Sequence, residues 1–167
     1  MPYAYSDLVL WSPETRSSQP DDDDVDGAPG RLVGAGRTLN HGLLLGALLG
    51  VPTARAEEII ADVDSLPSDV PRLFLENDLA EMIATYRGVH SRLGEAIDDE
   101  GRPVGGKGAA LAASGRLAQD DQGRLFVRTG HVSLADLVAD LARLSSFLEA
   151  AVASGLLVMK EGPGVDD

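Results

Sequence analysis

Two segments of the sequence have residue types at spacings that proteins use to bind ions or phosphate groups. Residues 22–27 place aspartates at the first, third and fifth positions of a calcium-type loop, followed by a glycine. Such loops need a bidentate acid at the twelfth position, which here is Val33. Residues 101–108 have the glycine and lysine spacing of a phosphate-binding loop, but Gly108 stands where a serine or threonine would hold magnesium. Neither segment predicts a binding site.

The histidines and carboxylates also give no catalytic arrangement. His41, His90 and His131 have no histidine or acidic residue three or four positions away, the spacing that metal-binding helices use. The absence of cysteine excludes thiolate metal sites and cysteine nucleophiles. Carboxylates one helical turn apart, such as Asp136 and Asp140, are typical of solvent-facing surfaces. We therefore predict no catalytic residue, no metal and no cofactor, and we expect that the protein is not an enzyme.

The charge is strongly acidic but unevenly distributed. The formal net charge is −13, which disfavours binding to nucleic acid and to anionic membrane surfaces. Residues 101–130 are the exception, with a net charge of +3. We call their five basic residues the basic island: Arg102, Lys107, Arg116, Arg124 and Arg128. The island either offers a site to an anionic partner or balances the charge of neighbouring acidic helices.

Two long helices are expected to dominate the fold, at residues 73–98 and 134–154. Each has apolar residues spaced alternately by about four and three positions, which forms an apolar seam along one side of a helix. The seam residues are Leu75, Leu79, Met82 and Tyr86 in the first helix, and Leu137, Leu141, Leu144 and Leu148 in the second. We expect these seams to form an interaction surface for a protein partner or for a second copy of the chain.

The remaining elements are shorter. We expect a strand at 5–11, two short helices within 39–66, a short helix at 108–113, a β-hairpin at 116–128 and a strand at 156–160. These elements predict a mainly α protein, a helical bundle with two long helices, an αα-hairpin and a small β-hairpin with edge strands; an α+β fold is the alternative. The expected division is an N-terminal strand with an acidic mobile loop (1–38), a helical core domain (39–160) and a frayed tail (161–167).

Residues 48–59 resemble two DNA-binding motifs. Their Leu-Gly-Val turn before a helix is similar to the helix-hairpin-helix motif, in which backbone N–H groups of the turn bind phosphate. Pro52 stands where that motif has its second glycine, and proline has no N–H to donate. The same residues also resemble a helix-turn-helix, whose second helix would offer Arg55 to DNA among several acids.

These observations lead to one expected function and one alternative. The N-terminus has no signal-like region, and the longest apolar run covers only residues 43–51, so we expect a cytoplasmic protein without membrane contact. We expect a non-catalytic protein–protein interaction module, of the adaptor, immunity, antitoxin or assembly kind, that forms a homodimer. The alternative is a nucleic-acid-binding regulator that uses the hairpin at 48–60, with Arg55, and the basic island.

Overall fold

The computed structural model describes residues 7–18, 30–64, 72–128 and 131–161. In chain order its elements are β1 (Asp7–Ser12), β2 (Ser17–Ser18), β3 (Arg31–Leu32), α1 (Ala35–Leu49), α2 (Ala54–Asp64), β4 (Arg72–Phe74), α3 (Glu76–Ala96), α4 (Gly105–Ala112), β5 (Leu117–Gln119), β6 (Leu125–Val127), β7 (Val132–Ser133), α5 (Leu134–Ala153) and β8 (Leu157–Glu161). Most helices and strands thus form close to the residues that the sequence pattern indicates.

The strands assemble into two antiparallel sheets, so the expectation of a mainly α helical bundle is wrong and the fold is α+β. The larger sheet has the order β2-β1-β8-β4, with β3 also paired to β1, and the smaller has the order β5-β6-β7. The error has a physical cause. The central pair joins the two ends of the chain, with Val9 opposite Met159, and local hydrophobic patterning contains no information about such a distant partner.

The larger sheet draws the N-terminal strand into the same core as the helices. β1 lies between β8 on one side and β2 and β3 on the other. Leu8 and Leu10 are fully buried in the core cluster, together with residues of α3 and α5. Within the described residues, β1 and β3 are therefore part of the core that the sequence assigned to 39–160.

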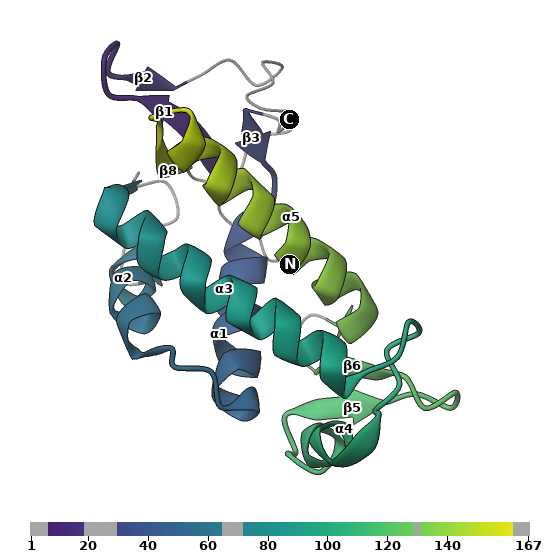
Figure 1. The fold of residues 1–167 in the computed structure, drawn as a ribbon. Coiled ribbons are helices and arrows are strands. Elements are labelled where there is room, and N and C mark those ends of the chain that lie inside the picture. Colours follow the sequence, from purple (N-terminus) through teal and green to yellow (C-terminus); the bar gives the residue numbers. More distant parts are fainter. Residues whose placement is uncertain (1–6, 19–29, 65–71, 129–130, 162–167) are drawn as a thin grey trace.

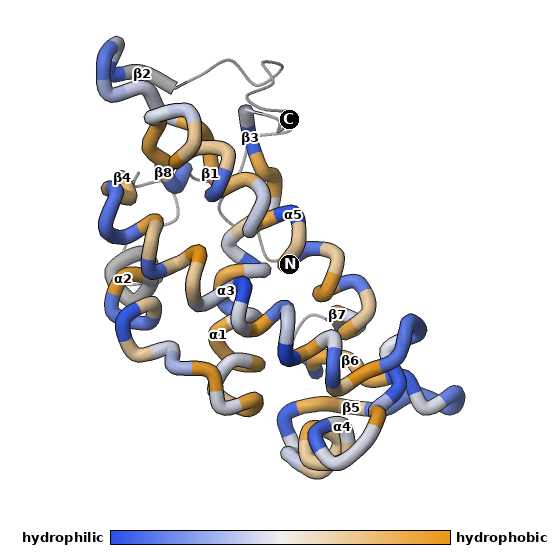
Figure 2. The backbone as a smooth tube through the Cα atoms, in the orientation of Figure 1, coloured by the Kyte–Doolittle hydropathy of each residue, from blue (hydrophilic) through white to orange (hydrophobic). Residues whose placement is uncertain are grey.

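Helices α3 and α5 lie side by side in opposite directions (Figure 1). The larger sheet is at one end of this pair, and α4 with the smaller sheet is at the other end. Hydrophobic residues recur along α1, α3 and α5, whereas the loop after α3 is largely hydrophilic (Figure 2). None of the described helices combines the length and the apolar character that crossing a bilayer requires.

The two apolar seams pack inside one subunit. Seven of their eight residues are fully buried: Leu79, Met82, Tyr86, Leu137, Leu141, Leu144 and Leu148. In the core they face each other and α1 rather than a partner, because the apolar side of α3 packs against the apolar side of α5. Only Leu75, just before α3, remains 54% exposed. The surface expected from the seams is therefore not presented by the folded subunit, apart from this residue.

Candidate functional site: the outward face of the small sheet

The smaller sheet has one buried and one outward side. Along β6 the side chains alternate, with Leu125 and Val127 buried and Arg124, Phe126 and Arg128 turned outward. The buried side packs against the helical core, together with Leu117 and Val132. The outward face of β5, β6 and β7, including the residues that flank these strands, is the candidate site.

Two arginines and a histidine form a row at one end of this face. Leu117 opposes Val127, and Val127 opposes Val132. Arg116 immediately precedes β5, Arg128 immediately follows β6 and His131 immediately precedes β7, so the three residues lie at the same end of the small sheet. All three residues are exposed. Like charges that lie at the same end of a sheet repel each other, so the nearness of Arg116 and Arg128 favours an anion between them.

The middle of the face is apolar and aromatic. By register, Phe126 lies between Ala118 and Ser133. Its ring stacks on the imidazole of His131, with ring centroids 5.5 Å apart and an interplanar angle of 22°. His131 has a φ of 53°, in the left-handed region that a non-glycine residue adopts at a cost. The stack therefore holds the ring of His131, the residue with the strained backbone, beside Arg116 and Arg128.

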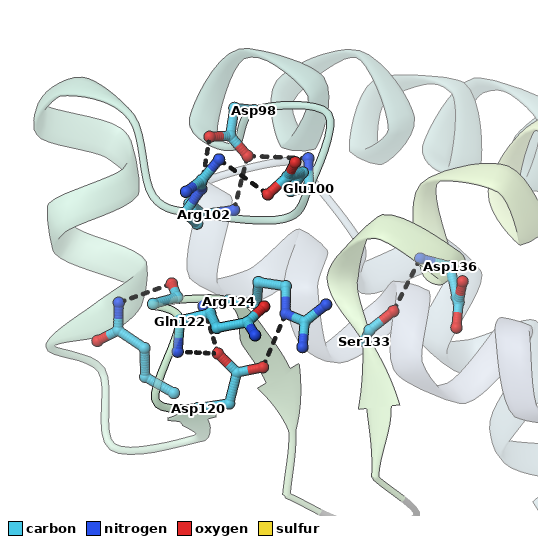
Figure 3. Close-up of polar contacts among 10 residues, drawn as sticks. Asp98, Glu100, Arg102, Asp120, Gln122, Arg124, Ser133 and Asp136 are labelled. Atoms are coloured by element: carbon cyan, nitrogen blue, oxygen red, sulfur yellow. Dashed lines mark hydrogen bonds and ion pairs between the residues drawn. The ribbon is translucent and has the colours of Figure 1, made fainter.

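The other end of the face is acidic and opens into a cleft of about 510 Å³. Asp120 and Arg124 are ion-paired there, with 2.8 Å between Oδ2 and Nε. Glu100 and Asp136 also line the cleft, as do Phe126 and His131. Figure 3 shows these acids on three separate elements: the loop after α3, the hairpin turn and the first turn of α5.

Backbone hydrogen bonds fix both acidic turns. Asp98 accepts hydrogen bonds from the backbone N–H groups of Glu100 and Arg102, and these bonds lower the pKa of the Asp98 carboxyl, the one from Arg102 most. Asp120 accepts from the N–H groups of Gln122 and Arg124, and its pKa is lowered in the same way, mainly by the Arg124 bond. Charge-assisted hydrogen bonds within each turn thus hold the backbone that carries Glu100 and Asp120, which line the cleft (Figure 3).

The start of α5 forms as its sequence indicates. The Ser133 hydroxyl accepts a hydrogen bond of 3.0 Å from the backbone N–H of Asp136, which caps the helix. The Ser133 hydroxyl therefore serves as the N-cap of α5. Asp136 lies in the first turn of α5, where the helix dipole favours a negative charge.

The structure divides the basic island into paired and unpaired residues. Arg102 pairs with Asp98 and Glu100, and Lys107 pairs with Glu95. With Arg124 held by Asp120, three of the five basic charges balance nearby acids. Arg116 and Arg128 form no ion pair with any other residue in the described ranges.

The hairpin at 48–60 is built for packing. Gly50 ends α1 with a φ of 76°, and the guanidinium of Arg92 donates to the Leu49 carbonyl oxygen across 2.9 Å. A Cβ at Gly46 would lie 2.7 Å from the Thr53 side chain, so α1 and the turn are in close contact. Arg55 lies at the exposed start of α2, where its Nε is 3.9 Å from Glu58. The phosphate-binding geometry that the resemblance implies is not needed to explain this turn.

The other sequence motifs do not become sites in the described residues. The acidic segment 22–27 lies outside them. Within 101–108, Lys107 pairs with Glu95, and Gly108 lies against the backbone of residues 96 and 103. No group of three histidine, cysteine or acidic side chains in the described ranges is arranged to hold a metal ion.

A second surface feature lies at the opposite end of the helix pair. Between α3 and the end of α5 there is a groove of about 510 Å³, lined by Glu76, Ala80, Ile83, Val152, Gly155 and Leu156. Val152 is 50% exposed, and Leu75 precedes Glu76 in the chain. Beyond the groove, the Arg87 guanidinium makes two hydrogen bonds to the Glu149 carboxylate. We call this feature the α3–α5 groove.

The cations of the site, Arg116, Arg124 and Arg128, are recognisable in the sequence. The Phe126–His131 stack and the acidic side chains of Glu100 and Asp136 beside them are not. The alternation at 124–128 is a signal for the shared face of Arg124, Phe126 and Arg128. The position of Arg128 close to Arg116 and His131 depends on how β6 pairs with β5 and β7, which the sequence pattern does not show.

Comparisons with protein families, with curated proteins and with solved structures return no significant match for this chain. The α+β fold and the geometry of its surface are therefore the basis for assigning a function.

Proposed function

We propose that the chain is a protein–protein interaction module that forms a homodimer through the α3–α5 groove. The supporting observation is a groove whose lining includes the half-exposed Val152 together with Ala80, Ile83 and Leu156. Exposed apolar side chains that gather at one groove favour burial against another protein surface. The apolar seams that the sequence predicts as the dimer interface are buried inside the subunit. The proposed interface is instead the groove where apolar side chains of α3 and α5 stay exposed.

A second copy fits this groove because the surface is made by two antiparallel helices. An isologous dimer brings the same patch together twice, and two antiparallel helix pairs then stack as a four-helix layer. A stable interface of this kind buries about 800 Å² from each partner. The groove and the flanking sides of α3 and α5, which run for 21 and 20 residues, provide a surface of suitable length.

Mass measurement across a concentration series tests the proposal. Light scattering after size exclusion is expected to give twice the chain mass of 17.5 kDa at high concentration. Val152→Asp and Ile83→Asp are expected to shift the mass to that of one chain, because a carboxylate would be buried in the interface. Val104→Asp is the matched control, since Val104 is 45% exposed and does not line the groove.

The two results that count against the homodimer are distinct. A single-chain mass for the unsubstituted protein at every concentration would exclude it. Equal effects of Val104→Asp and Val152→Asp on the dimer would show that the groove is not the interface. Thermal unfolding of each variant establishes that a change in mass does not arise from loss of the fold.

Nucleic-acid binding stays a second candidate because Arg116 and Arg128 are unpaired within the described residues. Its expected signature is an affinity for duplex DNA that falls steeply with salt concentration. The pairing of Arg102, Lys107 and Arg124 with acids weakens this candidate, since those charges are already balanced.

A further inference from the structure

We propose that the outward face of the small sheet binds an extended segment of another protein, with acidic residues at one end, an apolar residue in the middle and a basic residue at the other end. This interface is separate from the α3–α5 groove and does not depend on dimer formation. It rests on three rows of side chains whose chemistry changes along the strands.

The first row, with Arg116 and Arg128, selects carboxylates. Both guanidinium groups are exposed, and neither is neutralised by another described residue. Their repulsion is relieved when one or two carboxylates lie between them, and arginine binds carboxylates with paired hydrogen bonds. His131 lies beside Arg128 on the same face and adds an N–H donor.

The second row selects an apolar side chain. Phe126 and Ala118 provide an apolar floor, and the His131 ring stacked on Phe126 forms one wall. Phe126 and His131 also line the cleft of about 510 Å³ whose acidic residues make up the third row. Because residues two apart in a strand lie about 7 Å from each other, an extended peptide with the same spacing matches successive rows.

The third row distinguishes a peptide from a nucleic acid. Glu100, Asp120 and Asp136 line this end. Glu100 and Asp120 are paired with Arg102 and Arg124, so among the described residues Asp136 is the acid of this row whose charge no ion pair balances. A polyanion that follows the strands would place phosphate groups against these acids. A peptide that ends in a basic residue gains an attractive contact at the same position.

Charge substitution on both sides of the contact tests the proposal. The probe is the capped peptide Asp-Thr-Leu-Thr-Lys, titrated into the ¹⁵N-labelled full chain and followed by amide chemical shifts. We expect saturable shifts that include residues 116, 118, 126, 128 and 131. Peptides with lysine in place of aspartate, or serine in place of leucine, are expected to bind more weakly.

Matched arginine variants separate a specific contact from a general charge effect. Arg128→Glu is expected to weaken binding by about fivefold or more, whereas Arg55→Glu, with the same change in net charge, is expected to change it by less than about twofold. The Arg116→Glu/Arg128→Glu double variant is expected to prefer the peptide that carries lysine at both ends. This exchange of preference requires a folded face, so it remains informative if the double variant is less stable.

Three results would overturn the proposal. The first is the absence of shifts on this face at millimolar peptide, and the second is an equal loss of affinity in Arg128→Glu and Arg55→Glu. The third is tighter binding of a single-stranded thymidine oligomer, lost in Arg128→Glu, which would assign the face to nucleic acid. Val152→Asp is expected to leave peptide binding unchanged. Failure of the peptide-binding proposal is therefore distinguishable from failure of the homodimer proposal.

Discussion

The Tyr86 hydroxyl in α3 donates a hydrogen bond to the Leu39 carbonyl oxygen in α1, across 2.8 Å in the protein core. The aromatic ring lies directly against α1 at Gly42, where a Cβ would be 2.6 Å from the ring. Tyr86 was expected at a partner interface because it lies on the apolar seam. It instead ties two helices of one subunit together, and its position requires a glycine opposite.

Gly42→Ala is expected to lower the free energy of unfolding by about 1–3 kcal/mol, because the ring and the core around it must move. Gly94→Ala is the matched control, since Gly94 is also helical and has no atom within 4 Å of its ideal Cβ. The control is expected to raise stability by about 0.5–1 kcal/mol through helix propensity. Urea denaturation measures both, and equal effects would contradict the close approach of Tyr86.

Gly108→Ala is expected to destabilise the protein by about 2–3 kcal/mol, whereas Gly106→Ala in the same helix is expected to be neutral or slightly stabilising. A Cβ at Gly108 would lie 2.5 Å from the Ala96 carbonyl oxygen and 2.8 Å from the Pro103 backbone, and backbone atoms cannot turn aside. Gly106 has open space. Denaturant midpoints for the two variants test this, and a tolerated alanine at Gly108 would show that α4 can move away from α3.

The helices were predictable because their determinants are local. Apolar spacing, the Ser133 cap and the Gly50 turn identify the long helices and the αα-hairpin, and the structure has them near the expected residues. Local patterning could not show that α3 and α5 bury their seams against each other, since an apolar seam is the same whether its partner is internal or a second subunit. The choice between these outcomes depends on tertiary packing.

The sheets were only partly predictable because their pairing is not local. Strands at both ends of the chain were expected, but the β1–β8 ladder and its register depend on contacts between distant residues. Lys160 shows the consequence: it is 1% exposed because β8 lies in the middle of the sheet, between β1 and β4. Residue type alone would place a lysine at the surface. The hairpin was predicted, but the row of Arg116, Arg128 and His131 needs the second ladder, to β7.

His41 is expected to make stability fall as the solution becomes more acidic. Its side chain is only 6% exposed, and within the described residues its Nδ1 has no hydrogen-bond partner. Burial, and then the positive charge of Arg37, lowers the pKa of His41 below the ordinary value for histidine. The unfolded chain therefore takes up a proton at a higher pH than the folded chain. The stabilisation is complete above the ordinary pKa and is lost as pH falls from there toward the lowered value.

Variants isolate the contribution of His41 to this pH dependence. The free energy of unfolding, measured by urea denaturation between about pH 7.5 and 5.5, is expected to decrease for the unsubstituted protein. His41→Leu is expected to flatten the profile, and His90→Gln, at a half-buried position of α3, is expected to retain it. A profile with the same slope in His41→Leu would assign the effect to other groups.

Asp120 is expected to keep a pKa below the ordinary aspartate value even when the side chain of Arg124 is removed. The backbone N–H of Arg124 is the largest cause of the lowered pKa, ahead of the side-chain hydrogen bond and the charge of Arg124. Arg124→Ala retains that N–H, so the pKa measured by NMR titration should rise only part of the way. A return to the ordinary value would show that the guanidinium, not the turn, holds the carboxylate.

Because the pKa of Asp120 is lower in the folded chain than in the unfolded chain, the hairpin turn should be intact at neutral pH and should open as pH falls through the lowered value. The protection factors of the Gln122 and Arg124 amides, which correct for the slower intrinsic exchange at lower pH, should then fall together, which would link the wall of the cleft to a single carboxylate.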